Sequence, residues 1–196
     1  VNRLVQAHDE GLAERIAYKS ATIGGAALNH HDVAGHLELG RLGLEKPFDL
    51  VILQGGSGEP LRESRRRIFT ETARQHSAAI RETGAEVALY MTPAYSDVHS
   101  RYDPDMIDKI ASLYIETANE IGALVIPVGL AFEEAYKRKP DMILHEVFDG
   151  SHPELEGTYL AACVVFASLY NESPVGNSYT YFGEISAEDA AFLQQV

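Results

Sequence analysis

The sequence predicts an α/β fold, a three-layer α/β/α sandwich around a central parallel sheet with flavodoxin-like topology. Short apolar runs typical of buried strands alternate with longer segments of helical periodicity. These apolar runs end at glycine or proline turns, as expected where each parallel strand leads into a helix on one face of the sheet. In such sheets a ligand binds beyond the carboxyl ends of the strands, so we look for the site there.

The predicted strands are the short segments rich in aliphatic residues. The clearest is Phe48–Gln54 (FDLVILQ), a nearly continuous apolar run between Pro47 and Gly55-Gly56, which predicts a buried strand. The others, in chain order, are Ile16–Ile23, Val87–Thr92 and Leu124–Val128. The first of these alternates only in part and ends at Gly24-Gly25.

The predicted helices lie between these strands. Residues 1–10 place Val1, Leu4 and Val5 on one face, and Gly11 is expected to end that helix. The long helix Arg62–Thr83 is closed by Gly84. The remaining helical segments are an irregular stretch from Asp32 to about Leu44, then Pro104–Ile121, Leu130–Lys137, Glu154–Tyr170 and a last helix capped by Ser186.

The amino-acid composition limits the partners and the location that we expect for this protein. The 29 acidic and 16 basic residues give a net charge of −13, which argues against nucleic acid and anionic membranes as partners. No apolar run reaches the ~18 residues that a membrane span needs. Cys163 is the only cysteine and is expected to be buried; the lack of a disulfide fits the cytoplasm but also an exported bacterial enzyme.

The stretch Asp149-Gly150-Ser151-His152-Pro153 carries the clearest chemical signal. An aspartate three residues before a histidine, in a turn that opens a helix, can place a carboxylate against one imidazole nitrogen. The other nitrogen is then free to take a proton from a nucleophile. The alternative is an aspartate that only caps the following helix, beside an incidental histidine.

A second polar cluster follows the first glycine pair. A metal-binding site is one interpretation of His30, His31, Asp32 and His36, because histidine and carboxylate can bind zinc or manganese. Their spacing matches no metal motif, so we predict a polar loop and no metal ligand in this chain.

With these stretches in place, the chain resembles the SGNH (GDSL-type) hydrolase superfamily, in particular a bacterial branch whose first block reads Gly-Asn-Ser. The resemblance covers nearly the whole chain and rests on TIGGAAL (22–28), DLVILQGGS (49–57), DGSHP (149–153) and TYLAACVVFASLY (158–170). It implies a single domain over residues 1–196 that hydrolyses esters through an acyl-serine, without a metal or organic cofactor.

The resemblance also implies roles for individual residues. Asp149 and His152 would assist a serine nucleophile, while the Gly25 amide and the Gln54 side chain would bind the oxyanion. Gln54 stands where most of the superfamily has asparagine, so its longer amide must reach the same point.

The position of the serine is left open by the sequence. In the superfamily the serine follows the first strand, so we expect the first strand and the nucleophile of this domain to lie upstream of Val1. The other candidate is Ser178, because Gly176-Asn177-Ser178 has the wanted residues, although outside a strand-turn-helix context.

The expected substrate is a small acyl ester, by analogy an acetylated carbohydrate. The alternative is a non-catalytic domain of the same fold that binds carbohydrate without turnover. The oligomeric state stays open.

Overall fold

The computed structural model describes residues 1–43 and 45–196, so the predicted end of a helical stretch at Leu44 lies outside the described residues. The chain divides into two compact units. The first unit comprises Val1–Ala17, Pro93–Ile107 and Pro127–Val196, and the second comprises Tyr18–Thr92 and Asp108–Ile126. One domain over residues 1–196 stays a prediction.

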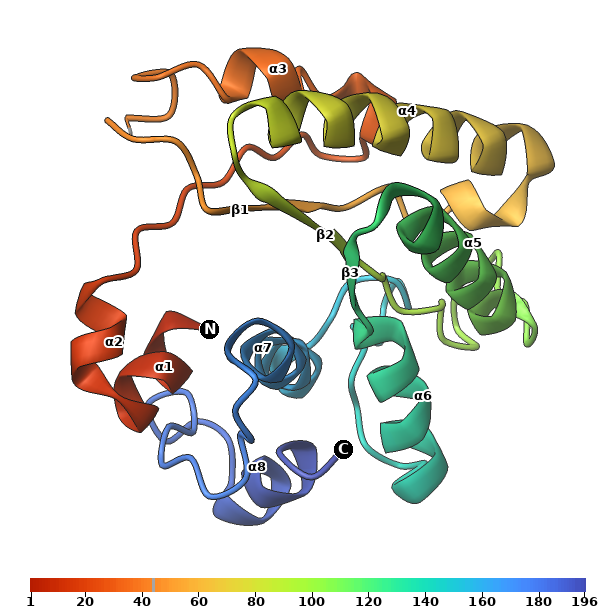
Figure 1. The fold of residues 1–196 in the computed structure, drawn as a ribbon. Helices are drawn as coiled ribbons and strands as arrows, with labels where there is room; N and C mark the ends of the chain where they lie inside the picture. The colour runs from red at the N-terminus through yellow and green to blue at the C-terminus, as the bar shows by residue number, and fades with distance from the viewer. Residues whose placement is uncertain (44) are drawn as a thin grey trace. The chain divides into compact units, whose positions relative to one another are not determined.

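The second unit contains a parallel sheet of β1 (Leu50–Leu53), β2 (Glu86–Tyr90) and β3 (Leu124–Ile126), in that order (Figure 1). Val51 pairs with Val87, and Leu89 pairs with Val125. The strands predicted within 48–54, 87–92 and 124–128 are confirmed, each somewhat shorter than predicted.

The helices of the second unit are η1 (Leu28–His30), α3 (Val33–His36), η2 (Glu59–Leu61), α4 (Glu63–Glu82) and, from Asp108 on, α5 (Met106–Ile121). η1, α3 and η2 all contact α4. α4 contacts β2 and lies side by side with α5, where the rings of Phe69 and Tyr114 are 5.0 Å apart (Figure 1). The other core residues of this unit include Ala73, Ile80, Val87, Leu89, Ile110 and Ile126.

The predicted strand Ile16–Ile23 is wrong. Throughout this described segment the backbone forms no strand, and Tyr18 and Ile23 are 72% and 51% exposed. A strand is stable only with a hydrogen-bonded neighbour, and β1, β2 and β3 do not pair with this segment.

Strand β1 is less buried than its apolar sequence predicts. Ile52 is 41% exposed. In the described sheet β1 pairs with β2 alone, so its other edge has no strand beside it.

The first unit is built around α7 (Leu155–Tyr170). This helix contacts α1 (Asn2–His8), α6 (Val128–Arg138) and α8 (Ala187–Leu193), as Figure 1 shows. The core residues are Leu4, Val5, Phe132, Tyr159, Leu160 and Phe166. The predicted helices 130–137 and 154–170 are confirmed, and Ser186 caps α8 by accepting a hydrogen bond from Asp189 N at 3.0 Å.

The predicted helix end at Gly11 is wrong. A further helix, α2 (Glu10–Glu14), runs through this glycine. The break comes instead at Asp9, whose side chain accepts a hydrogen bond from Leu12 N at 3.0 Å and so starts α2.

The fold class is confirmed as α/β with a parallel sheet. Within residues 1–43 and 45–196, no helix is both long enough and apolar enough to cross a membrane.

Candidate active site

The Asp149–Pro153 turn lies in the first unit, directly before α7. Asp149 Oδ1 accepts hydrogen bonds from the backbone amides of Ser151 (2.7 Å) and His152 (3.0 Å). This pattern is typical of an aspartate that stabilises a turn with its own side chain. It leaves Asp149 Oδ2 2.6 Å from His152 Nδ1. The carboxylate–imidazole contact predicted from the spacing is therefore present.

Backbone hydrogen bonds from two neighbouring segments hold this turn. Glu146 N donates to His152 O, and Gly150 N donates to Glu146 O, both at 2.8 Å. Ser96 N donates to Gly150 O, also at 2.8 Å. Gly150 has φ +64°, and a β-carbon there would lie 2.5 Å from Ser96 Oγ, so the turn requires glycine. These hydrogen bonds therefore fix the backbone that carries Asp149 and His152.

The electrostatics of the pair decide its tautomer. The amide of His152, the amide of Ser151 and the His152 ring lower the pKa of Asp149 to about 2. An ionised carboxylate only accepts hydrogen bonds, so Nδ1 of His152 must be the donor. Nε2 is then left to accept a proton, on a side chain that is 76% exposed.

A buried histidine, His145, lies next to the turn. It pairs with Pro153 in an isolated β-bridge and is 4% exposed. Its Nδ1 lies 2.8 Å from the hydroxyl of Tyr136, and the edge of the Phe132 ring packs against it. Burial lowers its pKa, which favours the neutral form of this histidine in its packing against Phe132.

The predicted oxyanion residues lie in two loops of the second unit. Gly25 is exposed, with φ +68°, in a turn closed by Ala26 N donating to Ile23 O at 3.2 Å. Gln54 follows β1 directly, and its exposed side chain makes no hydrogen bond within the described residues.

These two loops are joined by a buried carboxylate, Glu59. Its Oε2 accepts hydrogen bonds from Gly56 N at 2.6 Å and from Leu28 N at 3.2 Å. No motif in the sequence points to Glu59. A glutamate between Gly58 and Pro60 carries no sequence signal of burial, because its neighbours suggest an exposed turn.

Ser178 lies in an exposed loop of the first unit. Hydrogen bonds hold its two preceding residues in place: Asn177 Nδ2 donates to Leu4 O, and Gly176 N donates to Gln194 Oε1, both at 2.9 Å. Among the interactions of the described residues, none joins Ser178 to His152.

The histidine-rich segment forms local structure. His30 Nδ1 accepts a hydrogen bond from Ala27 N at 3.2 Å, and Asp32 caps α3 by accepting from Gly35 N at 3.0 Å. The described part of the chain contains no group of three or more histidine, cysteine, aspartate or glutamate residues that could hold a metal ion.

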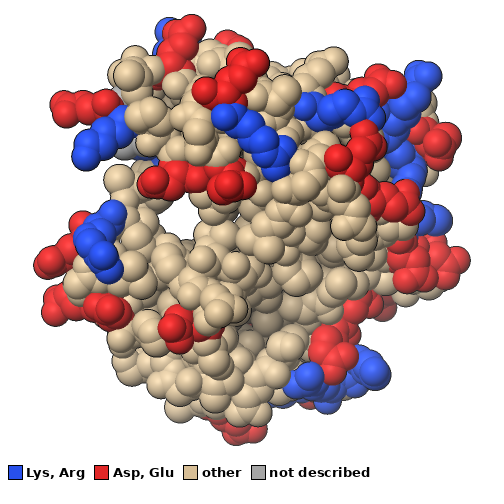
Figure 2. All heavy atoms as spheres, viewed as in Figure 1, with Lys and Arg blue, Asp and Glu red and all other residues tan. Residues whose placement is uncertain are grey.

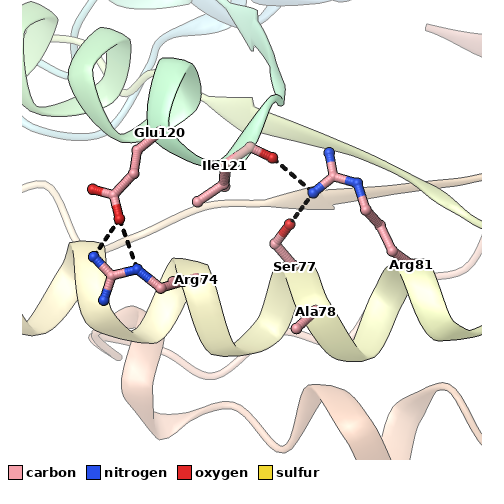
Figure 3. Close-up of a pocket in the computed structure, with 6 residues that line it drawn as sticks. All are labelled: Arg74, Ser77, Ala78, Arg81, Glu120 and Ile121. Atoms are coloured by element: carbon pink, nitrogen blue, oxygen red, sulfur yellow. Dashed lines mark hydrogen bonds and ion pairs between the residues drawn. The ribbon is translucent and has the colours of Figure 1, made fainter.

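A pocket between α4 and α5 in the second unit is lined by groups that pair with one another (Figure 3). Arg74 forms an ion pair with Glu120, and Arg81 donates to Ile121 O at 2.7 Å. None of the predicted site residues lines this pocket. We therefore read it as a structural contact between two helices.

Comparisons with known proteins identify the fold. No protein-family model matches the chain, and no curated protein sequence matches it. Among solved structures, a DUF4886 family protein from Bacteroides uniformis is 21% identical with a TM-score of 0.65, over 76% of this chain and 60% of that one. The chain therefore spans 60% of the length of that protein.

Two further structures are similar. A protein from Slackia heliotrinireducens, described as a candidate SGNH hydrolase, is 22% identical with a TM-score of 0.59, over 74% of this chain and 80% of that one. An acetyl xylan esterase is 16% identical with a TM-score of 0.65, over 85% of this chain and 88% of that one. At these identities the likeness establishes the fold, and this chain has the fold of the SGNH hydrolases.

Proposed function

We propose that this protein hydrolyses small acyl esters through an acyl-serine intermediate, with His152 as the general base and acid. The observation that carries the proposal is the 2.6 Å contact between His152 Nδ1 and an ionised Asp149, on a histidine side chain that is exposed. A histidine held in one tautomer by a carboxylate is the base that serine acylation needs.

In the proposed reaction, His152 Nε2 takes the proton from a serine hydroxyl as the oxygen attacks the ester carbonyl. Asp149 stabilises the imidazolium that forms, and His152 then gives the proton to the leaving alkoxide. Water, deprotonated by the same nitrogen, releases the acid and regenerates the serine. The Gly25 amide and the Gln54 side chain are the proposed donors to the oxyanion, worth about 3 kcal/mol each in comparable sites.

The proposed substrate is an acetylated carbohydrate. The support is the shared fold with a protein named acetyl xylan esterase, together with the family resemblance of the sequence. This part of the proposal is an analogy between proteins of the same fold.

The test is turnover of 4-nitrophenyl acetate by the complete natural protein and its His152→Ala variant. The variant should lose about 10³-fold or more in kcat, because it lacks the proposed base for the serine proton. His8→Ala, a histidine elsewhere in the first unit, is the matched control and should retain activity. Equal turnover by His152→Ala and wild type would refute the proposal.

A fluorophosphonate, which reacts with activated serines, would then identify the nucleophile by mass spectrometry of the tagged peptide. A tag upstream of Val1 or a tag on Ser178 would decide between the two candidates. A folded protein with no tag and no turnover, but with calorimetric binding of an acetylated xylo-oligosaccharide, would favour the non-catalytic binding domain instead.

A further inference from the structure

Glu59 is a buried carboxylate outside the Asp–His pair. It begins the short helix η2, and the residue is only 3% exposed. Burial raises its pKa, while hydrogen bonds from the Gly56 and Leu28 amides act in the opposite direction. Carboxylates are rarely buried without a partner because removing the charge from water is costly, so these two amides explain how this one is tolerated.

The two amides belong to the two loops that carry the proposed oxyanion donors. Leu28 lies three residues after Gly25, and Gly56 lies two residues after Gln54. Both donate to the same oxygen, Oε2, at 3.2 and 2.6 Å. Glu59 is therefore a direct hydrogen-bonded link between loops 24–28 and 54–56.

The loops approach so closely that side chains are excluded where they meet. A β-carbon on Gly56 would lie 2.9 Å from Ala26 O. A β-carbon on Gly55 would lie 2.6 Å from Glu59 Oε2 and 2.7 Å from the Phe69 ring. The glycine pair thus allows the carboxylate to reach both amides at once.

The other oxygen of Glu59 shows that this arrangement is not optimised for stability. Within the described structure, Glu59 Oε1 is buried without a hydrogen-bond partner. Burial raises the pKa of Tyr114, and the charge of Glu59 raises it further. Unpaired buried polar atoms oppose folding, so a role other than stability would account for a carboxylate here.

We propose that Glu59 is a positioning residue, whose carboxylate sets the spacing of the Gly25 and Gln54 loops and so aims their donors at the oxyanion. The inference rests on the proposed ester hydrolysis. Glu59 acts through the two loop amides and does not itself touch the substrate.

The test compares Glu59→Ala and Glu59→Gln in the complete protein. Glutamine keeps an oxygen that can accept both amide hydrogen bonds, whereas alanine removes the link. Glu63→Ala and Glu63→Gln are matched controls, because Glu63 is an exposed carboxylate four residues away at the start of α4. Hydrogen exchange of the Leu28 and Gly56 amides is measured beside kcat, KM and the melting temperature.

In Glu59→Ala both amides should exchange at least about tenfold faster, because their acceptor is gone. For 4-nitrophenyl acetate, kcat should fall about 10- to 100-fold at nearly constant KM, since an oxyanion donor acts in the transition state. Glu59→Gln should restore most of both values, and the Glu63 variants should match wild type.

Each readout can overturn a different claim. Unchanged exchange of Leu28 and Gly56 in a folded Glu59→Ala variant would refute the link itself. A loss of activity that only follows a lower melting temperature, with normal kcat per folded molecule, would refute positioning. A wild type without ester turnover would refute the proposed function, while accelerated exchange in that same protein would still support the link between the loops.

Discussion

Asp149 is the residue on which the Asp–His pair depends. One oxygen accepts two backbone amides and the other accepts the imidazole, so the carboxylate both shapes the turn and orients His152. Because these donors all favour the ionised form, they also explain the pKa of about 2.

This lowered pKa predicts how the Asp149 turn responds to acid. A carboxyl whose folded pKa is about 2 and whose ordinary value is 3.8 contributes stability that is complete above pH ~4 and is lost as the pH falls through about 2. Urea unfolding of wild type and Asp149→Asn should therefore show a stability difference that shrinks as the pH falls below 4.

The control for this prediction is Asp105→Asn, an exposed aspartate in another loop of the first unit. The same pH series on this variant measures how much of the effect comes simply from removing one aspartate charge. A difference for Asp149→Asn that stayed constant down to pH 2 would contradict the prediction.

At the scale of elements, α4 and α5 are joined by polar contacts along their length. Arg66 Nη1 donates to Lys109 O at 2.6 Å, Thr70 and Thr117 share a hydrogen bond, and Arg81 donates to the carboxyl end of α5. Arg81 donates to Ile121 O at 2.7 Å (Figure 3). It also donates to Gly122 O at 2.7 Å, and the two bonds satisfy carbonyls that the end of a helix leaves unpaired.

Removing the hydrogen bonds that Arg81 makes to the end of α5 should destabilise the protein modestly. Arg81→Met is expected to lower the free energy of unfolding by about 1 kcal/mol, because the hydrogen bonds are charged but partly exposed. Arg67→Met, an exposed arginine on the same helix, is the control and should stay within about 0.5 kcal/mol of wild type. Equal values for the two variants in urea unfolding would contradict the assignment.

At the scale of the whole molecule, the chain carries a large excess of acidic over basic residues. Acidic and basic side chains are interspersed on the face that Figure 2 shows, while the total charge is −13. Such an excess makes copies of the chain repel one another at neutral pH.

The repulsion should disappear near the isoelectric point of 5.0. Light scattering of the 196-residue chain should therefore be greatest near pH 5 and should fall as the pH is raised to 8. A maximum at pH 7 or above would show that association is not controlled by net charge.

Signals between residues close in sequence determined most of the secondary structure of this protein. The strands β1, β2 and β3 and the helices α4 to α8 follow from apolar runs, helical periodicity and caps, which act between residues close in sequence. The Asp149–His152 contact could also be predicted from local sequence, because the two residues are three apart and the side chain of Asp149 itself forms the turn between them.

Tertiary structure decided the rest. Ile16–Ile23 has strand composition but no strand beside it to pair with in the described structure. The burial of Glu59 depends on Leu28, a partner 31 positions away in the sequence. No spacing or propensity encodes such a pair, because only folding brings the two loops together.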